Sequence, residues 1–337
     1  MGKFKVAVVG LGSIAQIVHL PILKKMDEID LTAVCDVDES KANVLTKKFN
    51  IPRWYEQVDN MIEKEELDAV HICANSHYHF PMSYLALQND INVFVEKPIA
   101  LKADDALRLA KLAEEKNLTV MVGMQNRFRD DVQILREFIE KDELGEIFYI
   151  KAGWLKKWDR GSLRDWQTKK QQAGGGVMID LGSQLIDLAM FLTGLPKIKS
   201  VRMYDYTINP NLEVEDAALA VLQTESGMSV TIEVSWRMHM DHDMIYTHIF
   251  GKKGAAYLNP LRINKELHNN LVNVTPMITE TNKDRYKQAY RNEISHFYRV
   301  LEGVEKNMSS AMDAYYITRI IDALYESADT GREVFLS

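Results

Sequence analysis

Short apolar runs alternate with amphipathic stretches over the first third of the chain. Helical spacing of apolar residues predicts helices at Ser40–Phe49, beginning on a serine cap, and at Ala103–Lys116. Five short apolar runs predict buried strands: Phe4–Val9, Leu31–Cys35, Ala69–Cys73, Val93–Val95 and Leu118–Val122. This alternation is typical of an α/β fold in which a doubly wound parallel sheet carries helices on both faces.

The pattern changes near residue 123. A helix at Asp130–Glu140, a strand at Ile147–Trp154 and a Gly-rich helix start at Gly174 are predicted next, and helices at Tyr286–Leu301 and Ala311–Ala328 close the chain. Closely spaced strand patterns predict an antiparallel or mixed sheet: Val201–Ile208, Ala217–Gln223, Ser229–Ser235, Met244–Phe250 and Ala255–Leu258. We expect two domains, residues 1–123 and 124–337, with the option that the last helix packs back on the first domain.

The composition narrows the class of protein. The chain has 337 residues, of which 46% are hydrophobic and 26% charged, as in globular proteins. Its net charge of −7 argues against nucleic acid or an anionic membrane as partner. We find no apolar run near 18 residues and no secretory signal pattern, so we expect a cytoplasmic protein that spans no membrane. Cys35 and Cys73 are expected to be buried free thiols.

A Gly-rich turn directly follows the first predicted strand. Its sequence is G-x-G-x-x-A, and its candidate cofactor residues are Gly10, Gly12, Ser13, Ile14 and Ala15. The glycines allow a tight turn and close approach of a pyrophosphate, and the small Ala15 lets helix and strand pack closely. Asp36 ends the second strand, 21 residues after Ala15, where a carboxylate binds a ribose 2′-hydroxyl and repels a 2′-phosphate. The pattern therefore predicts dinucleotide binding, with NAD favoured over NADP.

Four further motifs carry a family resemblance: Glu96-Lys97-Pro98, Ile72-Cys73-Ala74 followed by His79, Asn126-Arg127-Phe128, and the stretch from Gly174-Gly175-Gly176 through Asp180 and Gln184 to Asp187. With the Gly-rich turn, the chain strongly resembles the glucose–fructose oxidoreductase, inositol dehydrogenase and rhizopine catabolism (Gfo/Idh/MocA) family over essentially its whole length. The resemblance implies an N-terminal Rossmann domain and a C-terminal α/β domain with a large, open, mostly antiparallel sheet. It also implies a homodimer or homotetramer that transfers hydride between a nicotinamide and a sugar, inositol or related polyol.

The resemblance assigns the catalytic residues. Lys97 aligns with the family's catalytic lysine, and it also follows a parallel strand at the sheet edge where such folds bind ligands. Asp180 aligns with an acid that orients the substrate. Position 184 aligns with a histidine that takes the hydroxyl proton, but this chain has Gln184, and an amide cannot act as a general base.

Three interpretations of Gln184 remain open. In the first, Lys97 itself is the base. In the second, another residue supplies the base, for which His239 and His242 are candidates, although a solvated loop is favoured for both. In the third, the protein is a regulator that responds to NAD and sugar without turnover. A glycosidase that uses NAD only transiently is a further alternative from a similar fold.

The remaining candidate residues surround these groups. Substrate contacts are predicted from the family's loop and motif positions: Arg127, Trp158, Arg164 and Trp166. Cofactor contacts are predicted at Ala74, His79, Glu96, Lys97 and Asn126, with His79 also a candidate buttress for the loop. We expect no metal site, because nothing completes a ligand set around His239 and His242.

Overall fold

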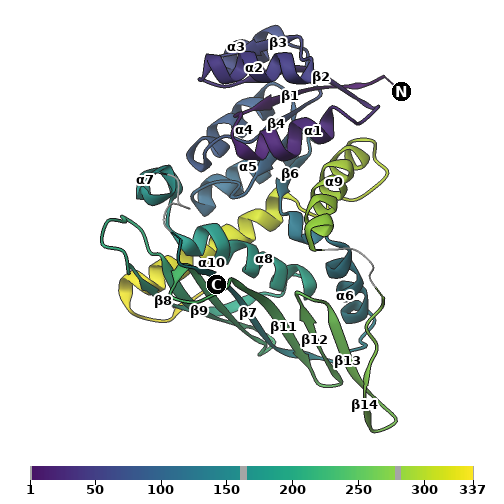
Figure 1. Cartoon of the computed structure of the whole chain (residues 1–337), viewed down its shortest axis with the longest axis vertical. Coiled ribbons are helices and arrows are strands. Elements are labelled where there is room, and N and C mark those ends of the chain that lie inside the picture. Colours follow the sequence, from purple (N-terminus) through teal and green to yellow (C-terminus); the bar gives the residue numbers. More distant parts are fainter. Residues whose placement is uncertain (1, 160–164, 278–281, 337) are drawn as a thin grey trace. The chain divides into compact units, whose positions relative to one another are not determined.

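The computed structural model describes residues 2–159, 165–277 and 282–336, in two compact units (Figure 1). The first unit contains residues 1–125 and 286–316, and the second contains residues 126–285 and 317–337. The chain therefore enters the second unit, returns to the first for most of one long helix, and then leaves it again.

The first unit is built on a six-stranded parallel sheet of order β3-β2-β1-β4-β5-β6. Its strands are β1 (Phe4–Val9), β2 (Ile29–Cys35), β3 (Arg53–Tyr55), β4 (Ala69–Ile72), β5 (Asn92–Glu96) and β6 (Val120–Gly123). The five predicted strands and their parallel arrangement are confirmed. The short β3 was missed, because its residues are only half-buried or exposed and give no apolar run.

Helices cover both faces of this sheet, as the alternation predicts. The helical segments are η1 (Ala15–His19), α1 (Leu20–Leu23), α2 (Glu39–Phe49), α3 (Val58–Lys64), η2 (Ser76–Tyr78), α4 (His79–Gln88), α5 (Ala103–Glu115) and most of α9 (Asn282–Leu301). One face packs Val9, Val70 and Val95 into a core with α3, α4 and α5. Strand residues alternate between faces. The opposite face therefore presents His71 and Phe94, which contact Phe297 of α9.

The start of α2 corrects one prediction. Asp38, rather than Ser40, is the N-cap, and its carboxylate accepts a hydrogen bond from the Lys41 backbone nitrogen at 2.9 Å. Both residue types are good caps, so the spacing alone did not distinguish them. The two cysteines are buried and free, as predicted, and burial raises the pKa of the Cys35 thiol to about 12.

A polar segment covers the open edge of the parallel sheet at β6. The Ser309 hydroxyl donates to the Val122 carbonyl at 2.7 Å, and the Val122 nitrogen donates to the Ser309 carbonyl at 2.9 Å. The Asn307 amide donates to the Val120 carbonyl at 2.9 Å. Residues 307–310 thus form hydrogen bonds with backbone N–H and C=O groups of β6 that an edge strand would otherwise leave open to pairing with other chains.

The second unit is built on a nine-stranded sheet of order β14-β13-β12-β11-β7-β10-β9-β8-β15. Among the described strands of this sheet, only the central β7–β10 pair is parallel, so the predicted mixed, mostly antiparallel sheet is confirmed. Its strands are β7 (Ile147–Lys157), β8 (Ile198–Tyr206), β9 (Ala217–Thr224), β10 (Ser229–Met238), β11 (Met244–Gly251), β12 (Gly254–Leu258), β13 (Arg262–Leu267), β14 (Asn270–Asn273) and β15 (Val334–Phe335).

The helices of this unit lie on one face of its sheet (Figure 1). They are η3 (Gln125–Phe128), α6 (Asp130–Glu140), η4 (Asp165–Thr168), α7 (Lys170–Ala173), η5 (Met178–Gly182), α8 (Ser183–Leu192) and most of α10 (Ala311–Thr330). All ten residues of α8 are buried. The segment Lys170–Leu192 is long and apolar enough to cross a membrane, contrary to the sequence expectation, but 94% of its apolar window is buried in the protein. Its buried part, which includes all of α8, lies in the core of this unit.

Two buried histidines predict a loss of stability in acid. Burial lowers the pKa of His71 well below 6.5, aided by nearby His19, and burial also lowers the pKa of His79. The unfolded chain therefore binds more protons than the folded protein as the pH falls below 6.5. We expect the free energy of unfolding to fall there, by at most about 1.4 kcal/mol per pH unit for each histidine.

Urea unfolding between pH 5 and 8 measures this slope. His71→Phe should flatten it, because phenylalanine keeps the stacking with Phe94 but binds no proton. A slope that is unchanged in this variant would contradict the assignment to His71.

Candidate active site

The Gly-rich turn has the backbone geometry that a dinucleotide requires. Gly10 has φ +83°, and a Cβ there would lie 2.5 Å from the Ala74 backbone nitrogen, so only glycine fits. A Cβ at Gly12 would meet no atom within 4 Å, which leaves its backbone open to a pyrophosphate. Ala15 is fully buried where η1 begins. These residues fit NAD.

Asp36 is held at the end of β2, beside this turn. Its Oδ2 accepts a hydrogen bond from the Leu11 nitrogen at 2.6 Å, and its Oδ1 accepts one from the Asp38 nitrogen at 2.9 Å. The Lys41 ammonium lies 3.2 Å from Oδ1. The sequence analysis missed this cation, because Lys41 lies inside the next helix. Asp36 thus fixes the turn and keeps a carboxylate where a ribose is expected.

The loop after β5 carries Lys97. Lys97 is half-buried, and the Lys97–Pro98 peptide is cis. The two ring nitrogens of His79 lie 2.7 Å from the Pro98 carbonyl and 2.9 Å from the Ala74 carbonyl. His79 is 2% exposed, so it buttresses the loop, as one of the two predicted roles requires. The preceding residue, Glu96, is hydrogen-bonded to His19 of η1 at 2.8 Å.

Asp180 and Gln184 belong to the second unit. The indole nitrogen of Trp236, on β10, donates to Asp180 Oδ2 at 2.9 Å. Trp236 is 2% exposed and therefore rigidly placed. Sequence analysis missed this partner, because the two residues are 56 positions apart in the chain. The carboxylate of Asp180 is thus oriented by a fixed donor.

Asp180 lies in a π-helical turn, η5. The Ser183 nitrogen donates to the Met178 carbonyl five residues back, where an α-helix would use the carbonyl four residues back. The side chains of Ser183 and Gln184 instead donate to the Ile179 and Asp180 carbonyls, at 2.6 and 2.9 Å. Gln184 Nε2 therefore supports the backbone of Asp180.

A buried carboxylate, Glu215, secures the start of this helical segment. Its two oxygens accept hydrogen bonds from the Gly176 and Met178 nitrogens, both at 3.0 Å, and from the Tyr325 hydroxyl at 2.8 Å. A Cβ at Gly176 would lie 2.0 Å from the Glu215 carbonyl, and one at Gly175 would lie 2.1 Å from the Tyr325 hydroxyl. We call Glu215 and Tyr325 the Glu215 clamp. It accounts for two of the three consecutive glycines.

The clamp carboxylate is only 4% exposed, and burial raises the pKa of Glu215 although its hydrogen bonds favour the charged form. Sequence analysis missed this residue. The sequence does contain one signal for it: Glu215 lies between the apolar Val214 and the strand that begins at Ala217. A carboxylate buried at such a place needs hydrogen-bond partners.

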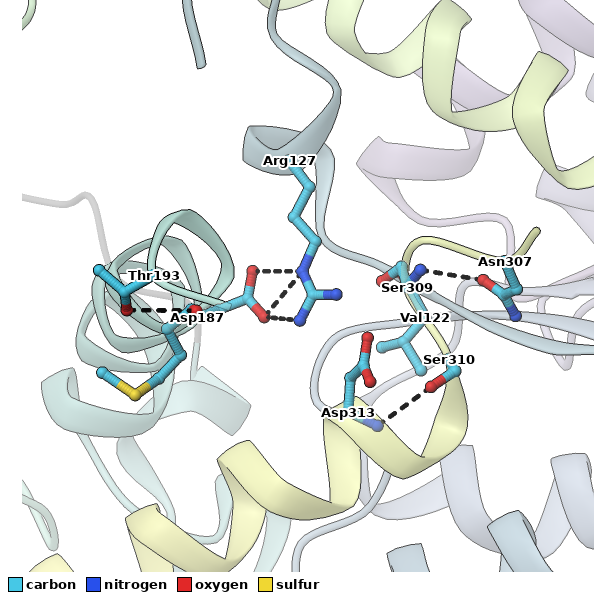
Figure 2. A network of polar contacts seen from close by, with 9 residues as sticks. Val122, Arg127, Asp187, Thr193, Asn307, Ser309, Ser310 and Asp313 are labelled. Carbon is cyan, nitrogen blue, oxygen red and sulfur yellow. Dashed lines mark hydrogen bonds and ion pairs between the residues drawn. The ribbon is translucent and has the colours of Figure 1, made fainter. Parts of the chain in front are cut away.

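Arg127 and Asp187 form a buried ion pair in the second unit. Both side chains are 1% exposed, and Arg127 Nη2 lies 2.5 Å from Asp187 Oδ1 (Figure 2). The guanidinium also lies 5.0 Å from the centre of the Phe191 ring. This pair ties η3 to the buried helix α8. The substrate contact expected of Arg127 stays a prediction, and the ion pair explains its burial without one.

The other predicted residues are dispersed. Trp158 is 41% exposed and its ring lies 5.6 Å from the Arg237 guanidinium, while Trp166 and Asn126 are half-buried. Arg164 lies outside the described residues. Exposed His242 pairs with its neighbour Asp241 at 2.7 Å. In the described parts of the chain, no cluster of three or more His, Cys, Asp or Glu side chains could hold a metal ion.

Comparison with known families agrees with this arrangement. Residues 4–124 match the model of an oxidoreductase family with an NAD-binding Rossmann fold. Residues 132–257 match the GFO/IDH/MocA C-terminal domain. The chain belongs to the Gfo/Idh/MocA oxidoreductase family. The predicted family, fold class and NAD cofactor are therefore confirmed.

Relatives in this family match nearly the whole chain. A D-glucoside 3-dehydrogenase of Escherichia coli (strain K12) is 28% identical, over 98% of this chain and 97% of its own length. A scyllo-inositol 2-dehydrogenase (NAD(+)) of Bacillus subtilis (strain 168) is 25% identical, over 93% and 90%. The crystal structure of GenD2 from gentamicin A biosynthesis, in complex with NAD, shares the fold with a TM-score of 0.86 at 23% identity, over 100% of this chain and 97% of GenD2.

Asp36 provides a test of cofactor choice in this family member. Asp36→Asn keeps the size of the side chain but removes the charge that repels a 2′-phosphate, and Lys41 remains beside it. We expect the affinity for NADP relative to NAD to rise about tenfold or more, as measured by calorimetric titration of both cofactors.

Asp38→Asn is the matched control, because Asp38 caps α2 and is also near Lys41. Equal shifts in the two variants would show that overall charge, rather than the position of Asp36, sets the preference.

Proposed function

We propose that this chain is an NAD-dependent dehydrogenase that oxidises a secondary hydroxyl of a sugar, glycoside or inositol to a ketone, or reduces the ketone. The observation that carries the proposal is Lys97 at the carboxyl end of β5, in the unit whose Gly-rich turn and Asp36 suit NAD. The names of the two relatives, a glucoside and an inositol dehydrogenase, support this substrate class.

Lys97 is the proposed base. Oxidation removes a hydride from the carbon and a proton from its hydroxyl, and NAD, when bound, accepts the hydride. The uncharged amine of Lys97 accepts the proton, so a ketone, NADH and a lysine ammonium result. In the reverse direction the ammonium donates its proton to the forming alkoxide.

Asp180 and Gln184 are proposed to position the substrate. The carboxylate of Asp180, oriented by Trp236, accepts hydrogen bonds from sugar hydroxyls. The side-chain nitrogen of Gln184 donates to the backbone carbonyl of Asp180 and so supports this residue, but Gln184 supplies no base. Of the interpretations left open, we therefore favour Lys97 as the base, because this role needs no further side chain to accept the proton.

Absorbance of NADH tests this assignment. Protein, NAD and a panel of glycosides, inositols, aldoses and sugar acids should produce NADH, and Lys97→Ala should lower turnover about 10²- to 10⁴-fold with NAD affinity retained. Gln184→Ala should lower turnover less, because it removes support and not the base. Equal turnover in Lys97→Ala and the parent protein would contradict the role of Lys97.

The alternatives have distinct outcomes in the same assay. Release of a sugar from a glycoside with no net NADH would favour the glycosidase. NAD binding with no turnover of any kind, together with stoichiometric capture of another protein from native lysate, would favour the regulator.

We also propose that the chain forms a homodimer or homotetramer through the outer face of the nine-stranded sheet. The helices of the second unit lie on the other face (Figure 1). The outer face carries half-buried aromatic residues in contact with one another. The Tyr149 ring is stacked on the Phe250 ring with centroids 5.7 Å apart, and the centroids of Tyr257 and Phe250 are 6.3 Å apart. Lys151 and Glu233, 3.2 Å apart, add charges of both signs that a second copy can match.

Sedimentation of the purified protein tests the proposed assembly. We expect a dimer or tetramer at micromolar concentration, and Phe250→Arg should produce monomers because it buries unpaired charge in the interface. Leu271→Arg, on the exposed edge strand β14, is the control and should leave the assembly unchanged. A monomeric parent protein would rule the interface out.

A further inference from the structure

Four buried polar side chains form a continuous hydrogen-bonded chain in the first unit. The Tyr298 hydroxyl, on α9, lies 2.8 Å from His71 Nε2, and His71 Nδ1 lies 2.9 Å from His19 Nδ1. His19 Nε2 lies 2.8 Å from Glu96 Oε1. We call these residues the Tyr298–Glu96 chain. Their exposed fractions run from 0% for both histidines to 9% for Glu96.

Aromatic rings pack closely around the middle of this chain. The His71 ring is stacked on Phe94, with centroids 4.8 Å apart and planes 10° apart. Phe297 contacts His71 edge-on at 5.7 Å, and His19 contacts Phe94 edge-on at 5.3 Å. These rings exclude water and hold each imidazole in one orientation. The nitrogen atoms can therefore satisfy their hydrogen bonds only with each other and with the two ends of the chain.

The two ends determine which atom donates in each hydrogen bond. An ionised carboxylate only accepts, so His19 Nε2 carries a hydrogen and donates to Glu96. In a neutral imidazole the other nitrogen is then an acceptor, so His19 Nδ1 accepts from a hydrogen on His71 Nδ1. By the same rule His71 Nε2 accepts from the Tyr298 hydroxyl.

The surroundings of each group agree with this single direction. Burial lowers the pKa of His71 well below its ordinary value, which favours the neutral ring, and burial raises the pKa of Tyr298 well above its ordinary value, which keeps its proton. All three hydrogen bonds therefore point from Tyr298 toward Glu96. Reversing all three would require a proton on Glu96, and reversing only the two nearer Tyr298 would require a second proton on His19. Either change would also leave the buried Tyr298 hydroxyl in need of a new acceptor.

We propose that Tyr298, His71 and His19 are positioning residues for the NAD site, and that they act by holding the Glu96 carboxylate through hydrogen bonds of one direction. His19 ends η1, the segment that follows the Gly-rich turn, and Glu96 directly precedes Lys97. One hydrogen bond thus joins two segments that the cofactor requires. The chain extends this link to α9, about 200 positions further along the sequence. The proposal rests on NAD binding and holds for any substrate.

The protonation states provide the first test and need no variant. Among the nine histidines in nitrogen-15 NMR spectra of labelled protein at pH 7, the two whose signals depend on the His71–His19 contact should both be neutral. One should be protonated at Nδ1, which identifies His71, and one at Nε2, which identifies His19, with His71→Phe confirming the assignment. A charged imidazole at either position, or Nε2 protonation of both, would overturn the directional chain.

The function of the chain is tested with Tyr298→Phe, which removes only the hydroxyl. His71 Nε2 then lacks its donor and stays buried without a hydrogen-bond partner, so the His71 ring loses one of the two hydrogen bonds that hold it against His19. We expect NAD affinity, measured by calorimetric titration of folded protein, to fall about three- to tenfold, the range for one buried hydrogen bond. The histidine NMR signals should change with it.

Tyr55→Phe is the matched control. It also removes one hydroxyl from the first unit, where Tyr55 donates to Glu65 at 2.6 Å outside the chain. Its NAD affinity and histidine signals should equal those of the parent protein. Unchanged NAD affinity in Tyr298→Phe, or an equal loss in both variants, would refute the positioning role. Failure to find a substrate would leave this result intact, because neither measurement uses turnover.

Discussion

The N–H groups at the start of a buried helix must find acceptors within the protein, because water does not reach them. In the second unit Glu215 meets this constraint, with one carboxylate accepting from Gly176 and Met178 and from the Tyr325 hydroxyl. Burial opposes the ionised form, so the carboxylate depends on these donors as much as they depend on it. The Asp180 turn follows directly. Its geometry therefore rests on a contact between residues far apart in the chain.

The first unit satisfies its buried polar groups in the same manner. His79 lies between the Ala74 and Pro98 carbonyls, Ser309 completes the edge of β6, and Glu96 is joined to His19. Each partner comes from a different element, so each hydrogen bond also fixes the position of one element against another. In both units the candidate site residues are thereby held by groups that need not touch a ligand.

Local patterns in the sequence were sufficient for much of the fold. Apolar runs located β1 and the other central strands, because buried parallel strands need apolar residues on both faces. Strands β13 and β14 were missed, since their mostly polar, exposed residues give no such run. Lys97 and Asp36 could be placed from their motifs, but Trp236 and Glu215 could not. Their importance comes from contacts across 56 and 39 residues, which no local pattern encodes.

The π-helical turn at Met178–Gly182 has a consequence for how this family member is compared with others. An α-helix advances about 100° per residue, so a turn that holds one extra residue rotates everything after it onto a different face. Residues with the same spacing in two relatives need not occupy the same place when only one of them contains such a turn. A sequence alignment at position 184 therefore compares residue types only. Whether two aligned residues have the same function there has to be judged from the backbone path of each structure.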